Sequence, residues 1–231
     1  MGQHYWSVIR ANVAEEGRDR EDALVRWWAD EHQPEYVAMD GFHLAWLART
    51  VAHESAFGDP GQRYAAIYEI DGIDHFNAAL AAGPPWGPWE EFVGKWVLDW
   101  TRTYYRLLDQ RSVSDAAGAY WTIVKSDVDL DGPEDEARFH EWYRETHVPE
   151  LLEHPGFHRA WRLELFPDPT DLGPRRHRFW AVYEVDSPAA FAGARASRAE
   201  RGIEPWDGLW LSQLRDWGVS YHEVVNRVVA D

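Results

Sequence analysis

The sequence predicts an α+β fold in which two βαββαβ units of one chain pack their sheets face to face. Three observations predict it. The chain repeats itself at a distance of 115 residues, each copy has strands and helices in the order βαββαβ, and each four-stranded sheet would leave one apolar face uncovered. Packing the two open faces together covers both. We therefore expect two repeats, residues 1–110 and 117–231, with a linker over 109–118.

The duplication is visible in residue pairs that match without a gap. They are Tyr5 and Tyr120, Trp6 and Trp121, Trp27 and Trp142, His32 and His147, Pro34 and Pro149, Gly41 and Gly156, Trp46 and Trp161, Tyr68 and Tyr183, and Phe76 and Phe191. After a two-residue insertion, Pro88-Trp89 matches Pro205-Trp206, and Asp99-Trp100 matches Asp216-Trp217. The unit is too long for a solenoid repeat, so each copy should be a small domain.

In the first copy, aromatic and β-branched segments predict strands over 5–13, 42–51, 63–70 and 99–107. Helical spacing predicts one helix that includes Leu24 to Glu35 and another over 73–82. Pro34 should bend or end the first helix, because proline lacks an N–H donor and crowds the carbonyl of Asp30. A glycine- and proline-containing loop is expected over 53–62, and a Pro/Gly/Trp segment over 84–89.

The second copy repeats this order. Strands are expected over 119–128, 157–165, 177–185 and 215–225, helices over 134–152 and 188–199, and a loop over 167–176.

Composition excludes several classes of function. A formal charge of −17 leaves no basic stripe for nucleic acid and disfavours anionic membranes. The absence of cysteine rules out disulfides and thiolate chemistry. No apolar run approaches the roughly 20 residues of a membrane span, and no signal peptide is evident, so a cytoplasmic protein is expected. The 15 Trp, 10 Tyr and 9 Phe supply bulky cores or flat walls for a ligand cavity.

Each copy resembles the dimeric α/β-barrel superfamily, which is ferredoxin-like, and within it the EthD-like proteins. The resemblance rests on Trp-x4-His-x-Pro-Glu in the first helix, on the Gly-Phe-His that follows, and on a strand ending Tyr-Glu-x-Asp. It covers nearly the whole chain, once per copy, and implies a tandem intramolecular barrel with a ligand between the sheet and helices of each unit. The superfamily is chemically diverse, so the resemblance implies a fold more than a reaction.

The helix histidines, His147 and His32, are the first candidates for catalysis, because histidine titrates near neutrality. An aromatic residue precedes each by four positions, Tyr143 before His147 and Trp28 before His32, and therefore shares its helix face. The alternative is that each histidine only satisfies a carbonyl freed by the proline.

Two further candidates for catalysis are Tyr183 and Tyr68 on the third strands. The same face of each strand carries a small residue, Ala181 or Ala66, which could leave room for a ligand. The phenols could stabilise an oxyanion. The alternative is a pair of core tyrosines.

We expect Glu69 and Glu184 to be solvated. The strand histidines His43 and His158 are assigned a structural role, on the face opposite the phenylalanine and tryptophan of the same strand, and Asp71 and Asp186 should cap helices.

The expected substrate-binding residues are aromatic walls and one arginine. They are Trp28, Trp142, Trp161, Trp46, Phe139 and Arg159. Arg159 and Arg162 replace Leu44 and Leu47 of the first copy, so the second copy is the better candidate for binding a carboxylate or phenolate.

No phosphate loop, nucleophile elbow or His-Glu-x-x-His metal helix is present. Six further histidines lack metal-ligand spacing with one another: His53, His75, His140, His154, His177 and His222. We therefore expect no cofactor and no metal, with haem held by His147 or His32 as the alternative.

The leading hypothesis is a cofactor-independent cyclase, isomerase or dehydratase (lyase) acting on a small aromatic or polyketide-like carbonyl compound. The alternatives are a haem enzyme, a cofactor-free quinone-forming monooxygenase, and a non-catalytic binding protein. The expected partner of the chain is a small-molecule substrate. The chain should be a monomer with an internal pseudo-dimer, or a homodimer.

Overall fold

A computed structural model describes residues 3–83, 94–174, 177–203 and 208–230. The Pro/Gly/Trp segment predicted over 84–89 and its counterpart Pro205-Trp206 lie outside the described residues.

The first repeat forms a four-stranded sheet with helices on its outer face. Its elements are β1 (Tyr5–Val13), η1 (Glu15–Arg20), α1 (Glu21–Trp27), η2 (Trp28–His32), α2 (Gln33–Val37), β2 (Phe42–Val51), β3 (Tyr64–Ile70), α3 (Ile73–Ala82) and β4 (Val97–Ser112). The second repeat has β5 (Tyr120–Val128), α5 (Pro133–Trp142), η3 (Tyr143–His147), α6 (Val148–Leu152), β6 (Phe157–Phe166), β7 (Phe179–Val185), α7 (Pro188–Glu200), α8 (Gly208–Gln213) and β8 (Leu214–Val229).

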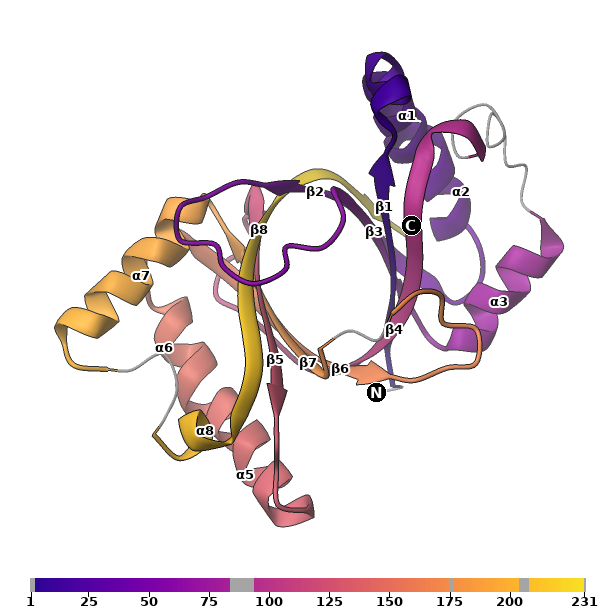
Figure 1. Cartoon of the computed structure of the whole chain (residues 1–231). Coiled ribbons are helices and arrows are strands. Elements are labelled where there is room, and N and C mark those ends of the chain that lie inside the picture. The colour runs from indigo at the N-terminus through magenta and orange to yellow at the C-terminus, as the bar shows by residue number, and fades with distance from the viewer. Residues whose placement is uncertain (1–2, 84–93, 175–176, 204–207, 231) are drawn as a thin grey trace.

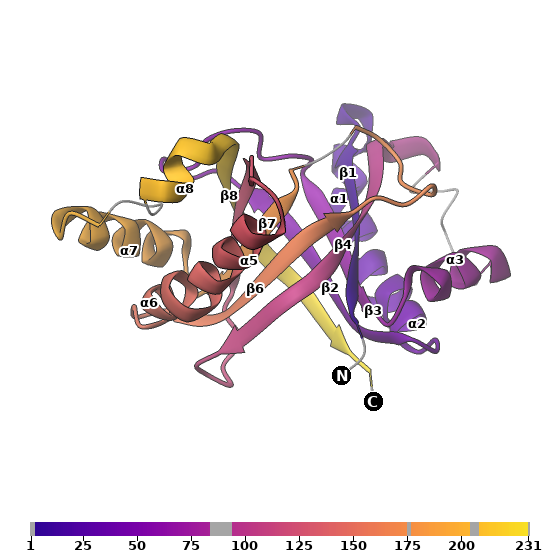
Figure 2. The same ribbon diagram turned by 90° about the horizontal axis from the view of Figure 1, so that it is seen from below.

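The eight strands close into one antiparallel barrel in the order β1-β3-β2-β8-β5-β7-β6-β4 (Figure 1). The helices of the two repeats lie on opposite outer sides of this barrel (Figure 2). The predicted fold class, α+β with tandem βαββαβ units packed sheet to sheet, is confirmed. Within the described ranges, every helix is too short or too polar to cross a membrane.

Strands β4 and β8 are longer than predicted, because each serves both repeats. The first part of β4 pairs with β1, and its residues from Tyr104 to Ser112 pair with β6. Similarly, β8 pairs with β5 and then, from Tyr221 to Val229, with β2. These shared strands leave no free sheet edge in the closed barrel.

The barrel interior is filled by tryptophan. Trp6, Trp46, Trp121 and Trp161 are at most 1% exposed, and their ring centroids lie 5.1–6.0 Å apart. The prediction that Trp46 and Trp161 line a substrate cavity is therefore wrong: they face the opposite side of the sheet from both helix layers.

A β-bulge explains this error. The register of β2 shifts between Phe42 and Leu44, at His43, and that of β6 shifts between Phe157 and Arg159. Because one extra residue inverts the alternation that follows, Phe42 faces the helices while Trp46 faces the barrel interior.

The predicted first helix continues past its proline in both repeats. One π-helical turn, η2 or η3, connects α1 to α2 and α5 to α6, and each proline lies in the first turn of the segment that follows. A wider turn accommodates the missing donor without ending the helix. As a consequence, both helix histidines close the π turn and point toward the sheet.

Two sequence predictions for acidic residues are also wrong. Glu69 and Glu184 are 8% and 2% exposed, since both face the barrel end rather than solvent; Glu184 accepts a hydrogen bond from the amide of Gly118 at 2.7 Å. Asp71 does not cap α3; its Oδ1 lies 2.8 Å from Nε2 of His43, and Asp186 and His158 form the same pair at 2.7 Å.

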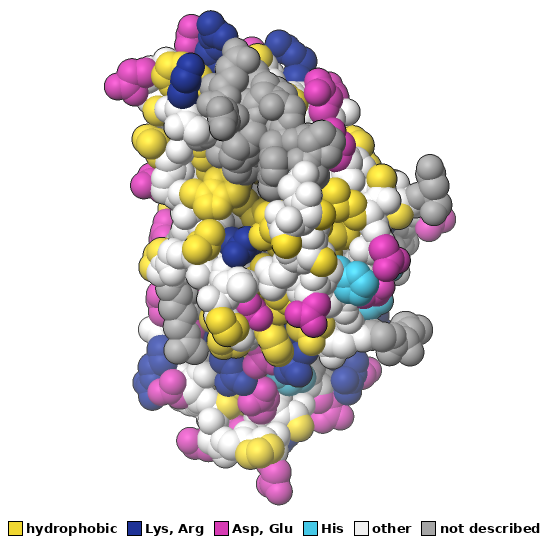
Figure 3. All heavy atoms as spheres, turned by 90° about the vertical axis from the view of Figure 1, so that its right-hand side faces the viewer, with side chains coloured by type: hydrophobic (Ala, Val, Ile, Leu, Met, Phe, Trp, Pro, Cys, Tyr) yellow, Lys and Arg dark blue, Asp and Glu magenta, His cyan; other side chains and the backbone are white. Residues whose placement is uncertain are grey.

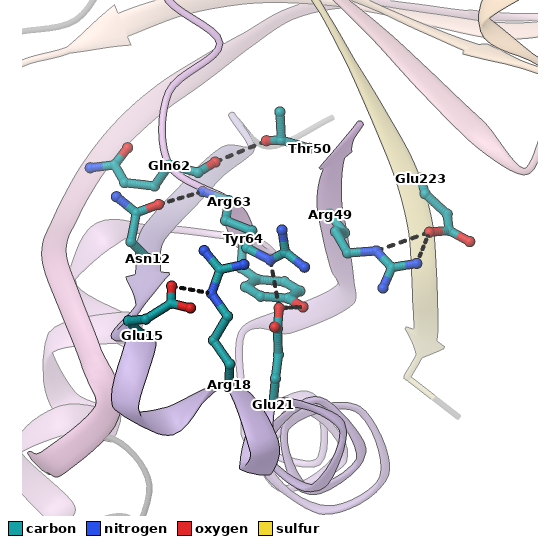
Figure 4. Close-up of polar contacts among 10 residues, drawn as sticks. All are labelled: Asn12, Glu15, Arg18, Glu21, Arg49, Thr50, Gln62, Arg63, Tyr64 and Glu223. Carbon is teal, nitrogen blue, oxygen red and sulfur yellow. Dashed lines mark hydrogen bonds and ion pairs between the residues drawn. The ribbon is translucent and has the colours of Figure 1, made fainter. Parts of the chain in front are cut away.

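Hydrogen bonds and ion pairs connect neighbouring elements on the outer side of the first repeat (Figure 4). Tyr64 and Arg63 at the start of β3 both donate to Glu21 of α1, at 2.5 Å. Arg49 of β2 donates to Glu223 of β8, and so joins the two repeats.

Candidate functional site

Each repeat contains a cavity between its outer sheet face and its helices, and the second repeat has the larger one, about 520 Å³ against about 140 Å³. The residues that line the larger cavity are Glu54, Ser55, Ala56, Phe57, Val124, Tyr143, His147, Leu151, Phe191, Ala192, Arg195, Ala196, Arg198, Ala199, Gly202, Ile203, Trp217 and Val219. Its volume suits a small organic ligand.

His147 enters this cavity from the π turn between two aromatic rings. The indole of Trp142, five residues earlier, stacks on the imidazole with centroids 4.6 Å apart, and the ring of Tyr143 meets it edge-on at 5.1 Å. The π turn brings a residue five positions away onto the same side, so the duplicated tryptophan is the partner of the histidine. In the first repeat, Trp27 stands in the same way 4.8 Å from His32.

His147 is neutral at physiological pH. Burial, followed by the positive charges of Arg198 and Arg162, lowers the pKa of this imidazole to about 3. Its Nδ1 is enclosed and has no hydrogen-bond partner among the described residues. The imidazole is thus available as a proton acceptor, or as a ligand, rather than as a proton donor.

Two arginines of α7 give the cavity a positive wall. Arg198 is 5% exposed and pairs with Glu150 of α6, while Arg195 lies 5.6 Å from the ring centroid of Phe57. In the first repeat the matching positions are Gly83 and Leu80. Neither arginine was among the predicted site residues, although a position-by-position comparison of the two copies distinguishes them.

Arg162 lies behind this wall as a fully enclosed cation. Its guanidinium carbon is 3.2 Å from the ring centroid of Tyr143 and 5.4 Å from that of Phe139. Burial lowers the pKa of this guanidinium, while the neighbouring hydroxyls of Tyr143 and Tyr183 oppose that shift. Since arginine stays protonated in proteins, β6 holds a buried positive charge where the first repeat has Leu47.

The first repeat supplies the cover of the larger cavity through its loop 52–63. Phe57 pairs with Val219 of β8 through backbone hydrogen bonds and packs edge-on against Trp217, with centroids 4.5 Å apart. Ser55 Oγ lies 2.6 Å from the hydroxyl of Tyr221. A cavity of the second repeat is therefore completed by the first.

The smaller cavity is lined by residues of the first repeat. They are Ile9, Trp28, His32, Tyr36, Tyr68, Phe76, Leu80, Trp100 and Arg102. Burial lowers the pKa of His32 to about 4. Arg102 donates to the carbonyl of Thr170, in the loop that the second repeat contributes. The surrounding face, on the right of Figure 1, carries hydrophobic side chains around a basic one near its centre (Figure 3).

The other predicted site residues lie outside the cavity walls. Tyr183 and Phe139 are 0% exposed in the layer between the second sheet and its helices, and the Tyr183 hydroxyl has no hydrogen-bond partner among the described residues. Arg159, predicted to clamp a substrate, instead reaches the linker carbonyl of Asp115 at 3.4 Å, because the β-bulge turns it away from the helix layer.

Comparison with solved structures identifies the fold. An anthrone oxidase-like protein superposes with a TM-score of 0.63 at 13% identity, covering 100% of this chain and 94% of the other. A candidate monooxygenase of Fusobacterium nucleatum gives 0.65 at 8% identity, covering 99% and 95%. A candidate chlorite dismutase, TA0507, gives 0.55 at 14% identity, covering 98% and 96%.

The chain has the ferredoxin-like dimeric α/β-barrel fold. No protein-family profile matches it, and no curated protein matches it by sequence. At these identities the likeness concerns the fold alone, so any activity has to be argued from the site.

Proposed function

We propose that the chain is a cofactor-independent enzyme that removes a proton from a small, anionic aromatic or polyketide-like carbonyl compound. One observation carries the proposal: His147 is a buried, neutral imidazole in a cavity that it shares with the cations Arg195 and Arg198. A base next to fixed positive charge is the arrangement that forms and stabilises an enolate or phenolate.

In the proposed step, His147 accepts a proton from a carbon next to the carbonyl. The electron pair of the broken C–H bond moves onto the carbonyl oxygen, which becomes an enolate close to the arginines. The substrate's negative charge offsets the cations that depress the pKa of His147, so the base becomes stronger once the substrate is bound.

The protonated His147 can then return its proton to another carbon or to a leaving hydroxyl. The first outcome is an isomerisation and the second a dehydration, while attack of the enolate carbon on a second carbonyl is a cyclisation. We assign the chain to this lyase or isomerase group, and to the EthD-like branch of its superfamily, on the sequence motifs and the cavity together.

Reaction of the same carbanion with oxygen would make the chain a quinone-forming monooxygenase. The neighbours named as anthrone oxidase-like and as candidate monooxygenases support testing this branch. Both branches share the first proton transfer, so they can be separated after that step.

The test measures proton abstraction directly. Anthrones, hydroquinones and cyclic 1,3-diketones that carry a carboxylate would be incubated in D₂O, with C–H exchange followed by NMR under nitrogen and oxygen uptake followed in air. The His147→Gln variant should lose about 10²- to 10⁴-fold in exchange rate, whereas the matched His32→Gln variant should retain it. Equal exchange by His147→Gln and the wild type would rule out His147 as the base.

Haem binding is a second candidate, favoured by the same neutral imidazole, which is the form that ligates iron. His147 would be the ligand, and Arg195 and Arg198 are the cations suited to pair with propionates. Bound haem would supply redox chemistry that the side chains lack. A Soret band that forms when haemin is added to the wild type, and not to His147→Gln, would favour this function over the first.

A further inference from the structure

At the end of the barrel, apart from both cavities, two imidazoles and a carboxylate of the first repeat converge. One ligand atom each from His4, His43 and Asp71 lies within 4.8 Å of the others. None of the three belongs to the lining of either cavity.

The strand register brings these residues together. At this end of the sheet, Ile70 of β3 is paired in register with Tyr5 of β1 on one side and with Phe42 of β2 on the other. His4, Asp71 and His43 each come directly before or after one of these paired residues, and the bulge of β2 falls at His43. Backbone hydrogen bonds hold this end, from the amide of Leu107 to the His4 carbonyl at 2.9 Å and from Asp71 to the carbonyl of Gly41 at 2.9 Å.

A fourth residue orients one of the imidazoles. Glu69, whose side chain is 10% exposed, lies 3.2 Å from Nδ1 of His4 and also 3.4 Å from the indole nitrogen of Trp6. A carboxylate that accepts a hydrogen bond from the other ring nitrogen of a metal-ligating imidazole fixes its tautomer and ring plane. The rings of His4 and His43 have their centroids 5.0 Å apart and remain partly open to solvent, with side chains 31% and 40% exposed.

The second repeat offers an internal comparison. Its His158 and Asp186 form the same pair as His43 and Asp71, but Ala119 stands at the place of His4. The backbone is equivalent there, because the carbonyl of Ala119 accepts from the amide of Val224 as that of His4 does from Leu107. A histidine–aspartate pair alone therefore serves the fold, and His4 adds a second imidazole to only one copy.

We propose that His4, His43 and Asp71 form a binding site for a divalent transition-metal ion such as Zn²⁺, with Glu69 as the residue that positions His4. Two nitrogens and one carboxylate oxygen suit Zn²⁺, Ni²⁺ or Cu²⁺ rather than Mg²⁺ or Ca²⁺, which prefer oxygen alone. Three protein ligands leave at least one position for water. A bound ion would link the ends of three adjacent strands.

The experiment titrates Zn²⁺ into the untagged full-length chain by isothermal calorimetry, with Mg²⁺ as the comparison ion. The wild type should bind Zn²⁺, and His4→Ala, which gives the first repeat the residue of the second, should weaken binding by more than about 100-fold at this site. The matched His158→Ala variant should bind as the wild type does. His177→Ala is made in each background, because Asp127, His177 and Asp216 form another cluster that could bind metal.

A second measurement identifies the ligand atoms directly. The EPR spectrum of the wild type with one equivalent of Cu²⁺ should carry hyperfine structure from two imidazole nitrogens, reduced to one in His4→Ala. Zn²⁺ affinity that is unchanged in His4→Ala, or a Cu²⁺ spectrum that is the same in both proteins, would overturn the proposal.

Discussion

His147 and His32 occupy matching positions in the two repeats, yet their surroundings differ in charge. Both imidazoles are buried, and burial lowers the pKa of each. Only His147 has two arginines acting on it, Arg198 and Arg162, and only its cavity is large. The two copies thus share the buried imidazole and differ in the arginines that act on it.

The pKa of His147 predicts an unusual pH profile. Because the neutral imidazole is the proposed base and its pKa in the free protein is about 3, kcat/KM should stay level from pH 8 down to about 5 and fall only as the pH approaches 3. An NMR titration of the His147 ring protons, assigned with His147→Gln, measures the same pKa independently. A midpoint near the ordinary 6.5 in both experiments would contradict the assignment.

Arg162 provides a second prediction at this scale. Arg162→Leu installs the residue of the first repeat and removes a buried charge, so the free energy of unfolding should be unchanged or rise by about 1–4 kcal/mol. Urea denaturation measures this. Activity on an anionic substrate should decrease, since positive charge near the developing oxyanion is lost. Loss of stability together with unchanged activity would show that the guanidinium serves packing instead.

At the scale of elements, the π turns and the crossed loops position the two sites. The π turn places each histidine against the duplicated tryptophan five residues earlier. The loop 52–63 and the segment 167–174 reach the opposite repeat, where Phe57 pairs with Val219 and Leu172 pairs with Arg102. The larger cavity is thereby lined from both halves of the chain, whereas the second half reaches the smaller cavity through its contacts with Arg102.

Removing the loop contact should affect only the cavity that it covers. Phe57→Ala deletes the aromatic cover and its contact with Trp217, so KM should rise by about tenfold or more while kcat changes less, because the base is untouched. Leu172→Ala, the matching change in the other loop, is the control and should leave both constants near their wild-type values. Equal effects of the two variants would mean that the smaller cavity also takes part.

At the scale of the whole molecule, the four central indoles and the shared strands join the two repeats. Trp6 and Trp46 come from the first half and Trp121 and Trp161 from the second, and they pack in one cluster. Strands β4 and β8 each continue from one sheet into the other.

This architecture predicts one cooperative unfolding transition. It also predicts a large decrease in the free energy of unfolding when one central tryptophan is replaced. Trp46→Ala should lower the free energy of unfolding by about 3–5 kcal/mol, because its cavity would be enclosed on all sides. Leu211→Ala, at a side chain 50% exposed, should change it by no more than about 0.5 kcal/mol. Denaturant curves followed by tryptophan fluorescence and by circular dichroism should coincide. Two separated transitions would show that the repeats fold independently.

The sequence by itself determined the duplication, the order of elements and the fold class, because periodicity and repetition are local properties that a chain carries without its partners. It also pointed to the helix histidines, Tyr143 and Tyr68, which the structure places on cavity walls. Only the tertiary structure decided which side of β2 and of β6 faces the helices, since a single bulged residue at His43 or His158 reverses the alternation. It also placed Ser55, Phe57, Arg195 and Arg198 around the cavity of His147, because these residues lie about 50 to 90 positions from His147 in the chain, a distance over which no spacing rule acts.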